Sequence, residues 1–516
     1  MKYCTLEEFE NMVMKKDNNH EEYYILSTNF YRLPNYSIFL NNVSIFDKTE
    51  RGTIKQDKEM VNKILTILKS GESIEKKASE EKKDKEENKI LEETKSSEEK
   101  KILDETKSSD KILDENKSSD KILDETKSSE DNKSLEEKKI LEEKKITEEK
   151  KILEEKKISE EKKKKLENLG ISDLEKRAIG SIMGMAIGDA MGSTYEFNEV
   201  DYDTIDLFGM ERENEGAFNL EPGQWTDDSS MGLCIADSLL VNNGNLIIND
   251  LMLRFLAWMS GGYNNAFIFN VKNGLYPRKS VGLGCNISMA LFRYYAVQND
   301  KTDAGDKNTS GNGSIMRNAA IPICFYYEIN KACEMARKQS LSTHQGLEAK
   351  ECCSLLTFII VTILDEKNTK NLKEILDSLD EFKTDVKSVE CLAKSKIEDD
   401  NPDRDWKKEK FRYNEKRVRR DPGYIGSYAM DNMAMSLHII YHTNSFKEAI
   451  IRAVNIRGDS DSVASVVGQI AGAYYPIEDM PSQWIERINK WDNEEIALRG
   501  YMLSRLYSKK SIYNNE

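Results

Sequence analysis

Apolar residues recur at helical spacing over most of the chain beyond residue 170, and the alternation typical of strands is scarce there. The clearest repeats predict helices over Leu174–Gly192, Ser229–Leu240, Leu251–Met259, Ser288–Ala296, Ala332–Ser340, Glu348–Leu364, Tyr428–Tyr441 and Ser462–Tyr475. The charged, weakly patterned stretch Leu364–Arg420 predicts surface helices and loops. We therefore expect an all-α bundle over residues 171–508, followed by a short C-terminal tail at 509–516.

The first 170 residues have a different pattern. Short apolar runs at 23–26 and 37–40 could form strands, and Glu59–Leu68 has a helical pattern. Residues 1–70 carry no recognisable chemistry, so we treat them as an N-terminal segment of unknown role. Residues 71–170 are a low-complexity spacer rich in lysine, glutamate and serine.

The spacer contains two kinds of short repeat. A decapeptide, KILDETKSSD, begins at residue 101 and has near copies at 111 and 121, after which isoleucines recur every six residues at 140, 146, 152 and 158. Six residues turn a helix through roughly 600°, so these isoleucines make no continuous stripe. The hexads could form a solvated helix held by Glu–Lys pairs, whereas the decapeptides are expected to be disordered. A flexible spacer and a partner-binding or phosphorylated tether both fit this composition.

Composition narrows the class of protein. The net charge of −15 argues against a nucleic-acid-binding protein, which would normally carry a basic face. The eight cysteines include no CxxC pair, which indicates reduced thiols rather than disulfides or a zinc site. No apolar run is long enough to span a bilayer, and the N-terminus has no secretory signal. We expect a cytoplasmic protein without membrane contact.

The first predicted helix carries glycine at 180, 184, 188 and 192. A glycine inside a helix costs about 1 kcal/mol relative to alanine. Four of them on one face predict unusually close packing against another helix.

An acidic turn, RGDSDS at Arg457–Ser462, precedes the last predicted helix. The apolar residues Val463, Val466, Val467 and Ile470 show that the helix begins there. Aspartate and serine commonly cap a helix N-terminus, and one such side chain is enough for that. Several carboxylate and hydroxyl oxygens in so few residues also suit a hard cation.

A second acidic turn, QWTDDSS at Gln224–Ser230, opens another buried helix. Two carboxylates about 5 Å apart repel each other by roughly 3 kcal/mol at an effective dielectric constant of 20. No lysine or arginine lies within ten residues of Asp227 and Asp228 in the sequence, so water or a cation must relieve this repulsion. Together the two turns offer enough hard oxygen ligands for two magnesium or manganese ions that share bridging carboxylates.

Five stretches then identify a resemblance: GMAIGDAMGSTYE at 184–196, TDD at 226–228, GNGSIMR at 311–317, STHQ at 342–345 and GDSDS at 458–462. Taken together, these five stretches make residues 174–508 resemble the ADP-ribosylglycohydrolase family. The resemblance implies an all-α orthogonal bundle with a two-magnesium centre in a cleft. It does not extend to residues 1–170.

The resemblance also implies which side chains hold the metals. Thr226, Asp227 and Asp228 would bind from one side, and Asp459, Asp461 and Ser462 from the other. The family usually has threonine at the position of Ser462 and glycine at the position of Arg457. The serine keeps the hydroxyl, and the arginine either contacts a phosphate or points outward.

For catalysis, the resemblance points to Glu196, Asp228 and Asp461. Glu196 matches the family's acidic residue on a loop near the scissile bond, although a glutamate after a helix could equally be solvated. The metals would bind the ribose hydroxyls and a water molecule, and the glycosidic bond would break through an oxocarbenium-like state. Which carboxylate is the acid and which is the base stays open.

The substrate-binding residues implied by the resemblance lie in three other segments. Asn312, Gly313 and Ser314 belong to a glycine-rich turn whose backbone N–H groups can bind a diphosphate. His344 matches a family histidine near the ribose, and Tyr428 could stack on adenine. Both of these side chains could instead be structural.

The implied activity is a magnesium-dependent hydrolase that removes ADP-ribose from a modified protein side chain or a related conjugate. The linkage to arginine, serine, a nucleotide or a small molecule is not specified. The alternative is a weakly active or inactive ADP-ribose-binding protein or scaffold with the same fold, because fold resemblance does not establish activity.

Overall fold

The computed structural model describes residues 52–70, 146, 149–150, 152–198, 216–266, 280–297, 310–396, 405–411, 425–492 and 494–507. Contacts divide the chain into two compact units, with boundaries at Leu68/Lys69 and Asn168/Leu169. The possible strands at 23–26 and 37–40 and the decapeptide repeats lie outside the described residues.

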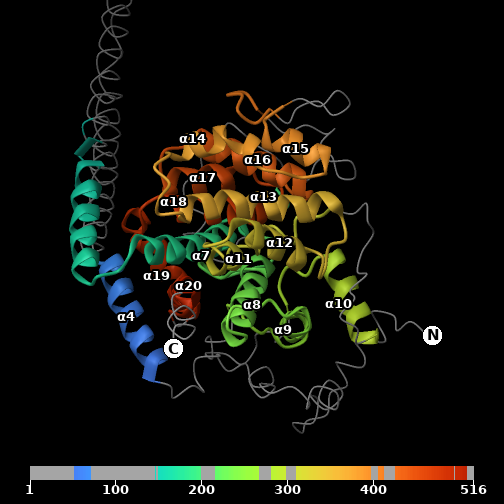
Figure 1. Cartoon of the computed structure of the whole chain (residues 1–516). Coiled ribbons are helices and arrows are strands. Elements are labelled where there is room, and N and C mark those ends of the chain that lie inside the picture. The colour runs from blue at the N-terminus through green and yellow to red at the C-terminus, as the bar shows by residue number, and fades with distance from the viewer. Residues whose placement is uncertain are drawn as a thin grey trace, which may run out of the picture. The chain divides into compact units, whose positions relative to one another are not determined.

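The larger unit is helical, and no β-strand occurs among its described residues (Figure 1). Its α-helices are α4 (Gly52–Lys69, of which Lys69 belongs to the smaller unit), α7 (Asp173–Gly192), α8 (Asp227–Val241), α9 (Ile248–Gly261), α10 (Cys285–Val297), α11 (Ala320–Cys324), α12 (Ile329–Ser340), α13 (Leu347–Leu364), α14 (Leu372–Asp377), α15 (Lys387–Ala393), α16 (Ala429–Tyr441), α17 (Phe446–Asn455), α18 (Ser460–Tyr474), α19 (Ser482–Asp492) and α20 (Glu495–Ser504). Two 3₁₀ turns, η1 (Leu379–Glu381) and η2 (Ile477–Asp479), complete the set.

The prediction of an all-helical fold is confirmed. Each of the eight ranges with a clear helical repeat contains a helix, and the charged stretch after Leu364 holds the short helices α14 and α15. The helices α11, α17, α19 and α20 were not predicted. Helix α11 has five residues, too few to show a helical period, whereas α17, α19 and α20 have ten or eleven and their apolar spacing was not recognised.

Helices α7 and α18 form the centre of the bundle and touch along their backbones. A Cβ atom added to Gly184 would lie 2.1 Å from the carbonyl oxygen of Gly468, and one added to Gly188 would lie 2.0 Å from that of Ala464. The residue numbers of the contacting pairs rise along α7 as they fall along α18, so the two helices are antiparallel. The close packing predicted from the glycines is confirmed, and only residues without a side chain allow it.

The other helices surround this pair. Helices α16 and α17 pack against α18, and α20 packs against both α7 and α8. Figure 1 shows α13, α16 and α17 on one side of α7, with α8 and α9 on the other. Within the described ranges, no helix combines the length and apolarity that crossing a bilayer requires.

Helix α4 precedes the spacer in sequence, yet residues up to 68 belong to the larger unit. Two of its charged residues reach α20 or its C-terminal end: Asp57 lies 3.5 Å from Arg505, and Lys58 lies 3.8 Å from Glu495. A helix outside the stretch that resembles the glycohydrolase family is therefore part of the bundle.

In the smaller unit, residues 152–168 are helical. The exposed pair Glu161–Lys165, at 2.7 Å, is of the predicted i, i+4 kind, and Ile146 and Ile152 are exposed. The helix expected for the hexad repeats is present over this range, but it is not solvated on every side, because Lys162 and Leu166 are buried.

Candidate metal centre

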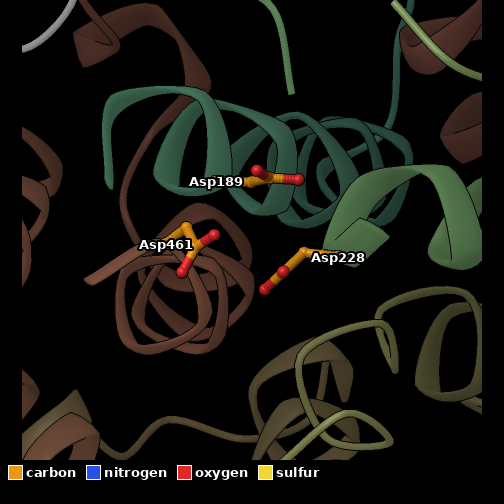
Figure 2. Close-up of side chains that lie close together, drawn as sticks. All are labelled: Asp189, Asp228 and Asp461. Atoms are coloured by element: carbon orange, nitrogen blue, oxygen red, sulfur yellow. The ribbon is translucent and has the colours of Figure 1, made fainter. Parts of the chain in front are cut away.

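Three helices bring three aspartates together (Figure 2). Asp189 lies near the C-terminal end of α7, Asp228 in the first turn of α8 and Asp461 in the first turn of α18. One carboxylate oxygen from each lies within 4.8 Å of the others, and all three side chains are buried. The two acidic turns recognised in the sequence therefore meet.

Local structure explains why α8 and α18 begin here. Both oxygens of Asp189 cap α8, accepting hydrogen bonds from the backbone N–H groups of Thr226 (2.9 Å) and Ser229 (2.8 Å). A Cβ atom on Gly192 would lie 2.4 Å from the Cα atom of Asp461, so the last glycine of α7 makes room for the start of α18.

The hydroxyl of Thr226 contacts all three carboxylates. Its Oγ1 lies 2.9 Å from Asp189 Oδ1 and 3.3 Å from one oxygen each of Asp228 and Asp461. A hydroxyl has one hydrogen, so it donates to only one of these acceptors. The remaining acceptor oxygens face one another across a short gap.

A second group of carboxylates shares Asp461. Oxygens of Glu196, Asp459 and Asp461 also lie within 4.8 Å of one another. Backbone hydrogen bonds hold Glu196 close, because Phe197 N–H donates to the Gly458 carbonyl at 2.8 Å and Gly458 N–H donates to that of Asn198 at 3.1 Å. Two carboxylate triplets with one common member result.

In the absence of a cation, the surroundings of this cluster disfavour the ionised form of its aspartates. Burial raises the pKa of Asp189 and Asp459 above the usual aspartate range. Burial and repulsion from neighbouring carboxylates raise the pKa of Asp227, Asp228 and Asp461 further. Nearby positive charge would reverse this effect.

The residues present fit a divalent metal ion. The donors are carboxylate and hydroxyl oxygens, which Mg²⁺ and Mn²⁺ prefer. Asp228 Oδ1 is buried and has no hydrogen-bond partner among the described residues. This oxygen is therefore available to bind a metal ion inside the cluster. The triplets Asp189–Asp228–Asp461 and Glu196–Asp459–Asp461 define where such ions would bind.

These pKa shifts predict how the metal-free protein responds to pH. An aspartate whose pKa is higher in the folded state stabilises the fold at low pH, and this stability is lost as pH rises through the raised pKa. We expect the melting temperature in chelator to fall as pH rises from about 4, the unfolded aspartate pKa, towards neutrality. Saturating Mg²⁺ should raise the melting temperature more at pH 8 than at pH 5. An equal Mg²⁺ effect at both pH values in a thermal-shift assay would contradict this.

Asp227 and Ser462 lie beside the triplets. A Cβ atom on Gly282 would lie 2.2 Å from Asp227 Oδ1, so this carboxylate faces the chain at residue 282. The hydroxyl of Ser462 lies 3.7 Å from Met316 Sδ. Neither residue belongs to a triplet, and their roles as metal ligands stay predictions.

Sequence reasoning missed Asp189. Its position was visible, because it follows Gly188 in the stretch with the predicted close packing. A carboxylate near the C-terminal end of one helix lies near the first turn of its neighbour when the two helices touch and are antiparallel. The antiparallel pairing was the information that the sequence pattern lacked.

Arg457 adopts a left-handed backbone conformation, with φ of 62°, directly before Gly458 at φ of 63°. Such a conformation costs a residue with a Cβ atom about 1 kcal/mol, which explains why glycine suits this position. We expect Arg457→Gly to stabilise the protein by about 1 kcal/mol and to leave metal binding unchanged. A lower melting temperature for this variant would show that contacts of the arginine side chain outweigh the backbone strain.

Beside the metal cluster, the predicted substrate-binding residues line one connected region. Asn312 Nδ2 donates to Asp459 Oδ2 and to the Gly426 carbonyl, both at 2.9 Å, which ties the glycine-rich turn to the acidic turn. Gly313 lies against the ring of His344. Ser314 is fully buried, and its hydroxyl accepts from Ser340 at 2.8 Å, so its side chain faces the core.

Tyr428 is the N-cap residue of α16 and is half-buried. Its hydroxyl donates to Glu348, whose other oxygen accepts from Ser388 at 2.6 Å. The hydroxyl is therefore used within the protein. Stacking of the tyrosine ring on a base stays a prediction.

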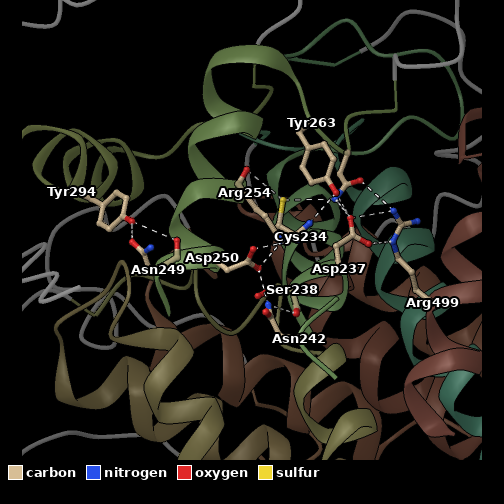
Figure 3. Close-up of polar contacts among 11 residues, drawn as sticks. Cys234, Asp237, Ser238, Asn242, Asn249, Asp250, Arg254, Tyr263, Tyr294 and Arg499 are labelled. Carbon is tan, nitrogen blue, oxygen red and sulfur yellow. Dashed lines mark hydrogen bonds and ion pairs between the residues drawn. The ribbon is translucent and has the colours of Figure 1, made fainter. Parts of the chain in front are cut away.

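A buried ionic network anchors α8 (Figure 3). Asp237 Oδ1 accepts from Arg499 Nε of α20 at 2.7 Å, and its Oδ2 accepts from Tyr263 at 2.6 Å and Asn264 at 2.9 Å. Burial acts to raise the pKa of Asp237, but Arg499 lowers it on balance, so the pair is ionic. The Asn264 carbonyl in turn accepts from Trp225 at 3.0 Å, which fixes the residue before Thr226.

The sequence is similar to those of known proteins over most of the larger unit. The family model for ADP-ribosylglycohydrolase matches residues 171–511. The ADP-ribosylarginine hydrolase Tri1 of Pseudomonas putida (strain GB-1) is 30% identical over 322 residues, covering 60% of this chain and 74% of that protein. The ADP-ribosyl-[dinitrogen reductase] glycohydrolase of Rhodospirillum rubrum is 24% identical, covering 62% of this chain and 92% of that protein. Human ADP-ribosylhydrolase ARH3 is 22% identical, covering 64% and 93%.

Because the family match spans more than half of the chain, this protein belongs to the ADP-ribosylglycohydrolase family. The resemblance inferred from the five sequence stretches is confirmed. Members of the family are ADP-ribosyl hydrolases.

Proposed function

We propose that this protein is a magnesium-dependent hydrolase that cleaves the glycosidic bond between ADP-ribose and a modified protein side chain, with ADP-ribosylated arginine as the first candidate. The observation that carries the proposal is the pair of buried carboxylate triplets that share Asp461. The candidate linkage comes from the two similar proteins named ADP-ribosylarginine hydrolase, which are 30% and 28% identical to this chain.

In this proposal, Asp189, Asp228 and Asp461 hold one ion, and Glu196, Asp459 and Asp461 hold the other. Thr226 adds its hydroxyl to the first group. Bound divalent cations would supply Lewis-acid stabilisation of charge and would orient the ribose hydroxyls. Mn²⁺ suits the same oxygen ligands.

Glu196 is proposed to handle the proton during bond cleavage. Of the carboxylates in the triplets, it alone lies in a turn after a helix rather than in or at the start of a helix. Asp189 is unsuited to this role because both of its oxygens accept hydrogen bonds from the start of α8. Transfer of a proton to or from a positioned carboxylate typically contributes a factor of about 10²–10⁴.

The adjoining region would bind the rest of the substrate. The backbone N–H groups around Gly313 and the ring of His344 are proposed to contact the ADP-ribose unit. Asn312 would act mainly by holding Asp459 in place, because its amide hydrogens are both used within the protein. Ser314 would contribute its backbone only, and Tyr428 would contribute its ring.

The test is a panel of proteins ADP-ribosylated on arginine or on serine, together with poly-ADP-ribose, assayed for ADP-ribose release with Mg²⁺ and with chelator. We expect release from the arginine conjugate with Mg²⁺ and none with chelator. Equal rates in chelator would refute metal dependence, and cleavage of the serine conjugate alone would refute the arginine linkage. Calorimetry with ADP-ribose separates the alternative, since tight binding without hydrolysis of any conjugate would indicate a binding protein.

A further inference from the structure

Arg317 is a fully buried cation with unusual partners. In the part of the chain that the structure describes, no carboxylate pairs with its guanidinium. Instead it donates to Thr343 Oγ1 at 2.6 Å and to Gln339 Oε1 at 3.2 Å, and it lies over the ring of Phe255. Burying a charge among neutral groups is costly. We therefore expect the hydrogen bonds of Arg317 to hold the surrounding side chains in place.

Thr343 lies between Arg317 and His344. Its Oγ1 is 2.8 Å from His344 Nδ1. Arginine has donors only, so the threonine oxygen must accept from Arg317. The single hydroxyl hydrogen is then free to donate to His344 Nδ1, which makes that ring nitrogen the acceptor.

The state of His344 follows from these contacts. A neutral imidazole whose Nδ1 accepts carries its proton on Nε2. Burial and the nearby charge of Arg317 lower the pKa of His344 to about 3, so the ring is neutral at physiological pH.

The Nε2 edge of His344 faces the glycine-rich turn. A Cβ atom added to Gly313 would lie 3.0 Å from Nε2, and one added to Gly311 would lie 3.5 Å from it. His344 is 3% exposed, and among the described residues no group accepts a hydrogen bond from Nε2. Because no described residue accepts from it, this Nε2–H group is available to an acceptor on a ligand.

We propose that Arg317 and Thr343 are positioning residues that fix His344 as the Nε2–H tautomer, so that it donates one hydrogen bond to an oxygen of the ADP-ribose unit. This rests on the proposed function only for the identity of the ligand. The relay from Arg317 through Thr343 to His344 is a property of the protein alone.

The alternative tautomer is disfavoured by the same hydrogen-bond count. With the proton on Nδ1, the Thr343 oxygen would accept from both neighbours, and its own hydrogen would have no acceptor among the described residues. A buried donor left unsatisfied in this way is unfavourable.

The tautomer is measured directly by two-dimensional ¹H–¹⁵N NMR of the full chain with labelled histidine. The chain has four histidines, and His344→Gln identifies the signals of His344. We expect the wild-type protein to show a protonated Nε2 and an unprotonated Nδ1, Thr343→Val to show a mixture, and Thr343→Ser to restore the wild-type state. An Nδ1–H signal in the wild type, or an unchanged spectrum in Thr343→Val, would overturn the proposal.

Binding of ADP-ribose by calorimetry provides the functional readout. We expect Thr343→Val to weaken binding about tenfold and Thr343→Ser to bind within about twofold of wild type. A merely structural role would lower the melting temperature of Thr343→Val without changing the tautomer or the affinity. If wild type fails to bind ADP-ribose, the proposed ligand is wrong, and the NMR result alone decides the relay.

Discussion

Replacing Asp461 by asparagine is expected to reduce hydrolysis on the order of 1,000-fold and to abolish stabilisation by Mg²⁺. Asp461 is the residue shared by the two carboxylate triplets, so its loss disrupts both proposed ion sites. In chelator the variant should melt at a higher temperature than wild type at neutral pH. The reason is that burial and repulsion from Glu196, Asp228 and Asp459 act against its ionised form.

The opposite signs of these two effects make the prediction specific. A variant that merely misfolds would lose activity and melt at a lower temperature with or without metal. Asp380→Asn serves as the matched control, because it removes the same charge from an exposed position in η1 and should change neither quantity. Near-normal turnover in Asp461→Asn would show that the triplets are not the catalytic centre.

Gly188→Ala is expected to destabilise the fold by about 3 kcal/mol. The added methyl group would lie 2.0 Å from the Ala464 carbonyl oxygen and 2.8 Å from the Ser465 backbone nitrogen, and backbone atoms cannot move aside independently. Helix α7 must therefore shift away from α18, which carries Asp189 away from Asp461. Thermal unfolding should show a clear loss of stability, and Mg²⁺ should stabilise the variant less than wild type.

Gly261→Ala is the control for this substitution. Gly261 is the last residue of α9, and an added Cβ atom would meet nothing within 4 Å. Alanine there should leave the free energy of unfolding within about 0.5 kcal/mol or raise it slightly. Similar melting temperatures for the two variants would mean that α7 and α18 do not touch as described.

Much of the fold was predictable because it depends on local periodicity. The long helices α7, α13 and α18 span several turns, and their apolar repeats identified them. The glycine row of α7 predicted a close partner, and Gly468 and Gly472 of α18 are the matching row. Both glycine rows are visible in the sequence, but the sequence does not show that the two rows contact each other.

Candidate site residues were predictable where several of them are close together in the sequence. A candidate residue that only folding brings beside the others was not predictable. The turns containing Asp228 and Asp461 stood out because each concentrates acidic residues before a helix. Asp189 is a single carboxylate within a helix and gains its role only when α8 begins beside it. Likewise, the relay from Arg317 to His344 joins residues whose contacts depend on the folded core.

The central claim is that two divalent ions bind between α7, α8 and α18. Anomalous diffraction from crystals of the full chain grown with Mn²⁺ tests it most directly. The account predicts two manganese peaks within about 2.5 Å of carboxylate oxygens, one at each triplet, with Asp461 touching both. Manganese bound elsewhere, with no peak at Asp461, would contradict it.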